Sequence, residues 1–228
     1  MFEFRRAVRG DDLRPLWNAA FEPDEVFFTR DYQPENAFIC ADNGKPVSML
    51  HLQRKTITAG GESLSAGYLM GIATDPAYRR RGLAGKLIEE ALRVCENLDC
   101  AFLIPASENL AVYYAKFGLT LRGRRPSTGH LSPCTGKAGC IETLSGLYER
   151  AYPDRAERTV YDWETILLEY DVRADGCRYT VGDGRGVLEA VPPPDTPADG
   201  CAACILPFTD RAGSLLTRYK PYINLLYT

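Results

Sequence analysis

The sequence lacks any apolar run long enough to cross a membrane, and its first residues lack the apolar core of a secretory signal. The opening "MFEFRRAVRGDD" reaches charges at Glu3, Arg5 and Arg6 before an apolar stretch begins. We therefore expect a cytoplasmic protein with no membrane partner. An excess of basic charge is lacking too, because 27 Lys and Arg stand against 30 Asp and Glu. A net charge of −3 argues against a basic nucleic-acid-binding domain.

Internal repeats and disorder-prone composition are also absent. Hydrophobic residues make up 45% of the chain and charged residues 25%, which is typical of a globular protein. The length of 228 residues exceeds the ~100 to 150 of one common domain. We expect one large domain, or one domain with a smaller partner.

Cysteine is the residue type with an unusual count, at eight. Cys40 and Cys100 lie in the apolar stretches "AFICA" and "DCAFLIPA", where a free thiol behaves as a small buried hydrophobe in a reducing compartment. The segment "CAAC" at 201–204 has the spacing of half a zinc site. Cys134 and Cys140 have the wrong spacing for the other half. We expect no metal site.

The order of predicted elements indicates an α/β unit with a mixed sheet in the first half of the chain. The order is strand, helix, three antiparallel strands, helix, strand, helix, strand. Asn43-Gly44 tolerates positive φ at both turn positions and predicts a hairpin. The strand "LSAGYLMGIAT" carries Gly67 and Gly71, which predicts a bulge or a close approach to its backbone.

The second half of the chain differs in composition. The segment "RRPSTGHLSPCTGKAG" lacks apolar periodicity and predicts a linker. We expect one domain over 1–125, a linker over 126–139 and a small α+β domain over 140–228. The apolar end "YKPYINLLYT" would be unfavourable in water, so we expect it to dock onto the protein.

A possible anion site lies in "GIATDPAYRRRGLAGKLIEEAL", where a strand leads through a turn into an amphipathic helix. A helix N-terminus offers unpaired N–H groups, and glycines let a phosphate approach them. Gly82 and Gly85 have the wrong spacing for a P-loop. A dinucleotide fingerprint requires glycine where Ala84 and Leu87 stand.

The remaining pattern, Arg79-x-x-Gly82-x-Ala84, resembles the acyl-CoA pyrophosphate loop of the GNAT superfamily of N-acetyltransferases. A second stretch, "VYYAKFGL", resembles that family's "LYxKxGF" segment. The resemblance covers roughly residues 2–125. It implies a mixed, mostly antiparallel sheet flanked by helices, with residues 140–228 as a smaller α+β appendage or degenerate second lobe. The glutamate in "ASENLAVYYAKFGL" and the short spacing after it resemble the enhanced-intracellular-survival type of this family.

The resemblance also implies acetyl-CoA as co-substrate and assigns roles by position. Tyr114, four residues before Gly118, matches the general acid that protonates the departing CoA thiolate. A backbone N–H near Ile72 would stabilise the oxyanion. Asn109 would contact the CoA arm, at a shorter spacing to Tyr114 than is common. The full set of expected cofactor-binding residues is Ile72, Ala73, Thr74, Arg79, Arg80, Arg81, Gly82, Leu83, Ala84, Gly85 and Asn109.

Some roles stay open. Tyr113 is the rival of Tyr114, because adjacent helix residues differ by about 100° in direction. No residue is marked as the general base: His51 is expected to point outward from a strand, and His130 lies in the linker.

The segment that borders the acceptor site in the family's fold is acidic here. Its carboxylates would attract a cationic amine. We expect transfer to a primary amine, which is unprotonated at the moment of attack; the alternative is a non-catalytic acyl-CoA-binding module with a regulatory or structural role. The sequence identifies neither the amine nor the oligomeric state. The acidic residues are Glu22, Asp24, Glu25, Asp31 and Glu35.

Overall fold

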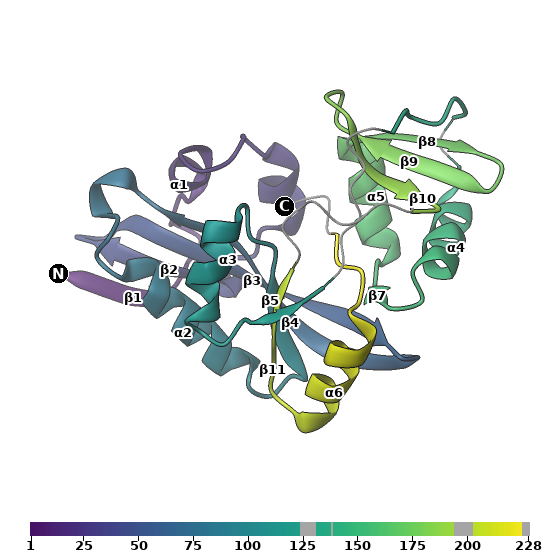
Figure 1. Ribbon diagram of the computed structural model, residues 1–228. Coiled ribbons are helices and arrows are strands. Elements are labelled where there is room, and N and C mark those ends of the chain that lie inside the picture. The colour runs from purple at the N-terminus through teal and green to yellow at the C-terminus, as the bar shows by residue number, and fades with distance from the viewer. Residues whose placement is uncertain (124–130, 138, 194–202, 225–228) are drawn as a thin grey trace.

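The computed structural model describes residues 1–123, 131–137, 139–193 and 203–224. The first part of the chain forms an alternation of strands and helices (Figure 1). Its elements are β1 (Phe2–Arg6), α1 (Arg14–Asn18), η1 (Phe27–Asp31), η2 (Pro34–Asn36), β2 (Ala37–Asp42), β3 (Lys45–Ala59), β4 (Glu62–Thr74), η3 (Pro76–Tyr78), α2 (Leu83–Cys95), β5 (Cys100–Leu103), α3 (Glu108–Ala115) and β6 (Leu121–Arg122).

The later part of the chain contains a second, three-stranded sheet with the order β10-β9-β8. Helices α4 and α5 pack beside this sheet, and the last strand and helix follow it. The elements are α4 (Ile141–Ala151), β7 (Arg155–Ala156), α5 (Val160–Glu169), β8 (Asp171–Asp175), β9 (Arg178–Gly182), β10 (Val187–Val191), β11 (Cys204–Pro207) and α6 (Asp210–Tyr219).

The large sheet has the strand order β1-β2-β3-β4-β5-β11-β6, with β7 paired to β3. All its pairings are antiparallel except that of β4 with β5. The predicted mixed, mostly antiparallel sheet with flanking helices is confirmed. The predicted hairpin is present as well, because Asn43 and Gly44 have φ angles of 50° and 78° between β2 and β3.

The two larger hydrophobic cores of the described residues lie against the large sheet. Helix α2 buries Leu87, Ile88 and Ala91 in one core, together with Leu50 and Leu69 of the sheet. The other core joins α1, the η1 segment and the smaller unit to the sheet. The smaller unit consists of α4, α5 and the three-stranded sheet of β8, β9 and β10. The apolar periodicity of α2 therefore gives the sheet one covered face, and the helix N-terminus is held at the end of β4.

The chain returns to the large sheet after the smaller unit. Strand β11 pairs antiparallel with both β5 and β6, and α6 packs on β11. Figure 1 shows the green unit to one side and the yellow β11 and α6 beside the large sheet. The predicted domain over 140–228 thus needs a correction: β11 and α6 belong with the large sheet, and the smaller unit is inserted between β6 and β11. Pairing over such a separation leaves no local sequence signal.

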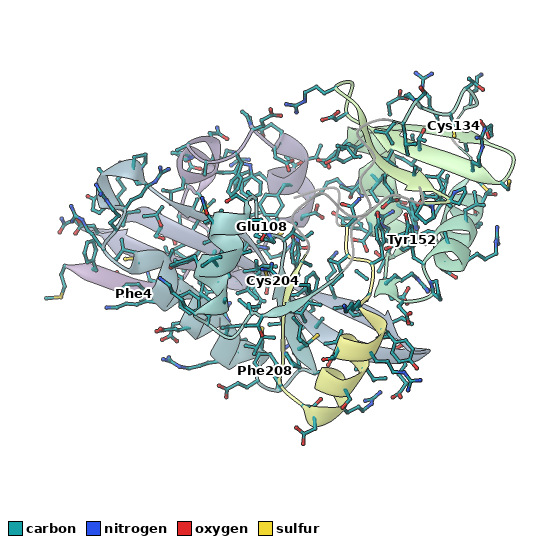
Figure 2. The ribbon with its side chains drawn as sticks, viewed as in Figure 1. Phe4, Glu108, Cys134, Tyr152, Cys204 and Phe208 are labelled. Carbon is teal, nitrogen blue, oxygen red and sulfur yellow. The ribbon has the colours of Figure 1, made fainter. Side chains whose placement is uncertain are left out.

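The C-terminal segment docks as predicted as far as the structure describes it. Tyr222 and Ile223 are buried, and the Tyr222 ring stacks on Tyr152 of the smaller unit with ring centroids 3.7 Å apart. Figure 2 labels Tyr152. Residues 225–228 lie outside the described part of the chain, as do 126–130 and 138 of the predicted linker. None of the described helices has the length and apolarity needed to cross a membrane.

Candidate active site

Strand β4 is bulged near its C-terminal end. Met49 of β3 pairs with Ala73 and His51 pairs with Met70, so Gly71 and Ile72 together face one residue of β3. Gly71 has a φ of 57°, and a Cβ there would lie 2.9 Å from the Trp17 ring. The predicted bulge is confirmed, and glycine is required at this position for both backbone conformation and space.

Strands β4 and β5 pair over a short stretch only. The parallel pairing runs from Ala66–Cys100 to Tyr68–Phe102. Beyond Tyr68, the structure shows no described strand paired with β4 on the β5 side. The end of β4, which includes Ile72, Ala73 and Thr74, therefore offers backbone groups at a free edge. Such an edge can hydrogen-bond an extended chain as an added strand would.

The loop after β4 presents a continuous series of free amides. Within the described residues, no hydrogen bond is found for the backbone N–H groups from Arg80 to Gly85. The first amide of this region with an acceptor is that of Lys86, which donates to the Gly82 carbonyl at 3.2 Å. Six free amides at the start of a 13-residue helix form a site suited to a phosphate or pyrophosphate.

Gly82 shapes this loop. Its φ is 77°, and nothing lies within 4 Å of where a Cβ would stand. Arg80 also has a positive φ, 62°, which is unusual for a residue with a side chain. Two of the three arginines brace the loop, because Arg79 donates to the Thr74 carbonyl at 3.1 Å and Arg81 to the Ala77 carbonyl at 3.2 Å. Their charges still surround the free amides.

The two adjacent tyrosines of α3 have different surroundings. Tyr114 is buried, and this burial raises its pKa to about 12, helped by Tyr113 and Cys204. Its phenol therefore stays protonated at neutral pH and is able to donate a proton. Tyr113 is half-buried, and its hydroxyl lies 3.4 Å from where a Cβ of Gly85 would stand. Tyr113 thus faces the start of α2, whereas Tyr114 packs toward β11.

Helix α3 is capped at both ends by local residues. The Ser107 side chain accepts a hydrogen bond from the Leu110 amide at 3.3 Å, and Gly118 follows the helix with a φ of 83°. Asn109 is exposed in the first turn, next to Glu108 (Figure 2). Its contact with the CoA arm stays a prediction.

The acidic segment at 22–35 is partly engaged within the protein. Asp24 accepts from the Phe27 amide at 2.7 Å, and Glu22 pairs with Arg185 of the smaller unit at 3.1 Å. Glu169, at the end of α5, lies beside Asp24, and burial together with Asp24 raises its pKa to about 7. The sequence analysis did not single out Glu169, because only the packing of the smaller unit brings it to this segment.

His51 differs from the expectation that it points outward. The side chain is 4% exposed and packs edge-on against Phe27, with ring centroids 5.3 Å apart. Burial lowers the pKa of His51 to about 4, so the ring is neutral at pH 7. The expectation was wrong because η1 folds over this part of β3, a contact between distant segments that strand alternation does not reveal.

Of the predicted cysteine positions, Cys40 and Cys100 are buried free thiols, and Cys204 is buried and accepts a hydrogen bond from Arg122 at 2.8 Å. Cys201 lies outside the described residues. No group of three or more metal-ligating side chains is found in the described part of the chain.

Comparison with known proteins finds a matching family model for the part of the chain that contains this site. Residues 10–122 match the family model of the acetyltransferase (GNAT) domain. The matched part of the chain ends with β6. No curated protein sequence matches the chain. The match covers the bulged strand, the loop of free amides and both tyrosines.

Solved structures share the fold. A GCN5-related N-acetyltransferase from Kribbella flavida aligns with a TM-score of 0.59 at 16% identity, covering 84% of this chain and 57% of that one. A putative acetyltransferase from Pyrococcus horikoshii aligns with a TM-score of 0.58 at 12% identity, covering 98% and 95%. Eis1 from Mycobacterium abscessus aligns with a TM-score of 0.53 at 17% identity, covering 79% and 52%, so this chain spans about half the length of Eis1. The chain therefore contains a GNAT acetyltransferase domain over residues 10–122, and this family uses acetyl-CoA.

Proposed function

We propose that this acetyltransferase transfers the acetyl group of acetyl-CoA to a primary amine of a small cationic molecule, by direct attack of the amine in a ternary complex. The observation that carries the proposal is the series of six amides from Arg80 to Gly85 that have no partner among the described residues and that follow the free edge of β4 after the η3 turn. A pyrophosphate and an extended amide-bearing arm are the two chemical parts that these backbone groups suit.

The donor-binding residues are proposed as follows. The amides from Arg80 to Gly85 bind the pyrophosphate, and the open space at Gly82 lets it approach the backbone. Arg79, Arg80 and Arg81 add positive charge, and Ile72, Ala73 and Thr74 hydrogen-bond the pantetheine arm through the β4 edge. Bound acetyl-CoA supplies an activated thioester. An amide at Ile72 that stabilises the developing oxyanion would contribute about 3 to 4 kcal/mol.

Tyr114 is proposed as the general acid that protonates the leaving thiolate. Its high pKa keeps the proton in place until a strong base forms beside it. A positioned acid of this kind contributes about 10²- to 10⁴-fold in rate.

The acceptor is proposed to be cationic because carboxylates gather on the η1 side of the sheet. Asp24 and Glu169 lie together there, and burial, together with the charge of Asp24, raises the pKa of Glu169 to about 7. A cation nearby would be stabilised by these groups.

The test is release of free thiol from acetyl-CoA in the presence of a panel of amines, for the wild type and Tyr114→Phe. Amine-dependent release whose kcat falls about 10²- to 10⁴-fold in Tyr114→Phe is the expected result. Tyr113→Phe is the matched control, since it removes the hydroxyl that faces Gly85 and is expected to change the KM for acetyl-CoA more than kcat.

Two outcomes would contradict the proposal. Binding of acetyl-CoA that is lost in Gly82→Glu, without turnover of any amine, would identify a non-catalytic acyl-CoA-binding module. Turnover limited to neutral or acidic amines would contradict the proposal of a cationic acceptor, although it would still support acetyl transfer to an amine.

A further inference from the structure

Trp17 of α1 packs directly against the bulge of β4. The atoms nearest to the place of a Gly71 Cβ are Cζ3, Cε3 and Cη2 of the Trp17 ring, at 2.9, 3.5 and 3.8 Å. Trp17 is buried, with 3% of its surface exposed. The ring therefore occupies the space that a side chain at position 71 would need.

The bulge reverses the alternation of side chains along β4. Met70 and Ala73 both belong to the core that includes Trp17, although regular alternation would place them on opposite faces. Gly71 is the extra residue, and its φ of 57° sets the directions of the peptide groups on either side of it. Glycine by itself populates several backbone conformations, so packing has to select this one.

The Trp17 ring is itself fixed by its neighbours. Its Nε1 donates to the Glu22 carbonyl at 3.0 Å. The ring stacks on Phe27 with ring centroids 4.6 Å apart, and Phe28 packs edge-on with centroids 5.5 Å apart. A rigid ring with a satisfied donor and close aromatic neighbours has little freedom to move, so it can hold the backbone that it contacts.

The bulge lies beyond the end of the pairing between β4 and β5, so it is part of the free edge of β4. We propose that Trp17 is a positioning residue for acetyl transfer: it holds Gly71 and thereby aims the Ile72 amide at the carbonyl oxygen of the thioester. This inference rests on the proposed function, in which that amide stabilises the oxyanion. A displacement of about 1 Å in such a group can cost about 10²-fold in rate.

Steady-state kinetics of Trp17→Leu, with an amine that the wild type acetylates, test the proposal. We expect kcat to fall about tenfold to 10²-fold, with a smaller change in the KM for acetyl-CoA. Trp163→Leu is the matched control, because Trp163 is the other tryptophan and is buried in the smaller unit; it should lower the melting temperature and leave kcat unchanged. Trp17→Phe keeps an aromatic ring beside Phe27. It should show an intermediate kcat and serves if Trp17→Leu does not fold.

A double-mutant cycle separates positioning from loss of packing. Gly71→Ala places a methyl group against the Trp17 ring and should lower kcat. In Trp17→Leu the same change should lower kcat much less, because the opposing ring is absent while the backbone strain at position 71 is the same. Independent effects of the two substitutions on kcat would overturn the proposal. So would a Trp17→Leu protein that loses stability as Trp163→Leu does and keeps its kcat.

Calorimetric titration distinguishes failure of this inference from failure of the proposed function. ADP carries a pyrophosphate without the pantetheine arm, so it probes the loop before α2 alone. We expect Trp17→Leu to bind acetyl-CoA more weakly than the wild type and ADP equally well. A wild type that binds acetyl-CoA and acetylates no amine would contradict the proposed function. The difference between the two ligands would then still support an edge held by Trp17, and its absence would overturn that as well.

Discussion

The loop before α2 and the polar core of the smaller unit use polar groups in opposite ways. The loop leaves the amides from Arg80 to Gly85 free at an open surface. In the smaller unit, Arg158 binds both carboxylate oxygens of Glu189 at 2.7 and 2.6 Å, and both side chains are fully buried. Glu189 also accepts from the hydroxyls of Tyr179 and Tyr222.

This contrast distinguishes a ligand site from a structural one. Free polar groups at a surface remain solvated until a ligand replaces the water, so they are available for binding. Buried charges have to be paired within the protein, and Arg158 additionally lies over the rings of Tyr148 and Trp163. The buried pair also joins the smaller unit to the C-terminal segment, because Arg158 donates to the Asn224 carbonyl at 2.8 Å.

The largest effect should come from removing one partner of the buried pair. Glu189→Ala leaves the Arg158 charge without its carboxylate, and we expect the free energy of unfolding to fall by about 3 to 5 kcal/mol. Urea unfolding measures the change. Glu62→Ala is the control, since it removes an exposed pair with Arg211 and should change stability by at most about 1 kcal/mol. Equal effects of the two substitutions would show that Glu189 has no special structural role.

A smaller effect on stability is expected in the loop before α2, where a substitution can be tested separately for its effects on stability and on ligand binding. Gly82 and Gly61 share a φ of 77° with no neighbour within 4 Å of a Cβ, so alanine at either position should cost about 1 to 2 kcal/mol of stability. Only Gly82→Ala should also weaken acetyl-CoA binding, because its methyl group occupies the surface of the free amides. Thermal unfolding and titration with acetyl-CoA measure the two properties. Unchanged acetyl-CoA affinity in Gly82→Ala would argue against the proposed pyrophosphate position.

The smallest effect concerns Glu169, where the smaller unit meets the acidic segment at Asp24. Its pKa is raised to about 7 in the folded protein from an ordinary value of 4.5. The folded state therefore favours the protonated form of Glu169. The contribution of that proton to the free energy of unfolding is fully present below about pH 4.5 and is lost as the pH rises through 7. Glu169→Gln resembles the protonated acid, so its melting temperature should exceed that of the wild type above pH 7 and approach it near pH 5. A difference independent of pH would contradict this.

Much of the fold could be predicted because its signals are local. Asn43-Gly44 gave the β2–β3 hairpin, the apolar periodicity of 83–95 gave α2, and Gly71 gave the bulge of β4. The free amides also follow from short-range features, namely a left-handed Gly82 and a helix start directly after it. The resemblance to GNAT enzymes, carried by the loop and tyrosine motifs, agrees with the family match.

Other parts of the site depend on contacts between distant segments. Glu169 lies beside Asp24 only because the smaller unit packs against the η1 segment. His51 is buried by Phe27 and Tyr32, although its place in a strand gave no sign of which face would be covered. A polar cavity lies along the open edge of β3 because β2 and β7 pair with separate parts of that strand.

The sequence alone set the backbone of the proposed donor-binding region: its turn, bulge, free amides and following helix depend on glycines and on apolar spacing along one short stretch of the chain. The tertiary structure decided that β11 completes the large sheet, which side chains of the smaller unit meet the acidic segment, and that Arg158 and Glu189 are buried together. The reason is physical. Backbone conformation responds to neighbouring residues, whereas burial and charge pairing depend on whichever surfaces the completed chain brings into contact.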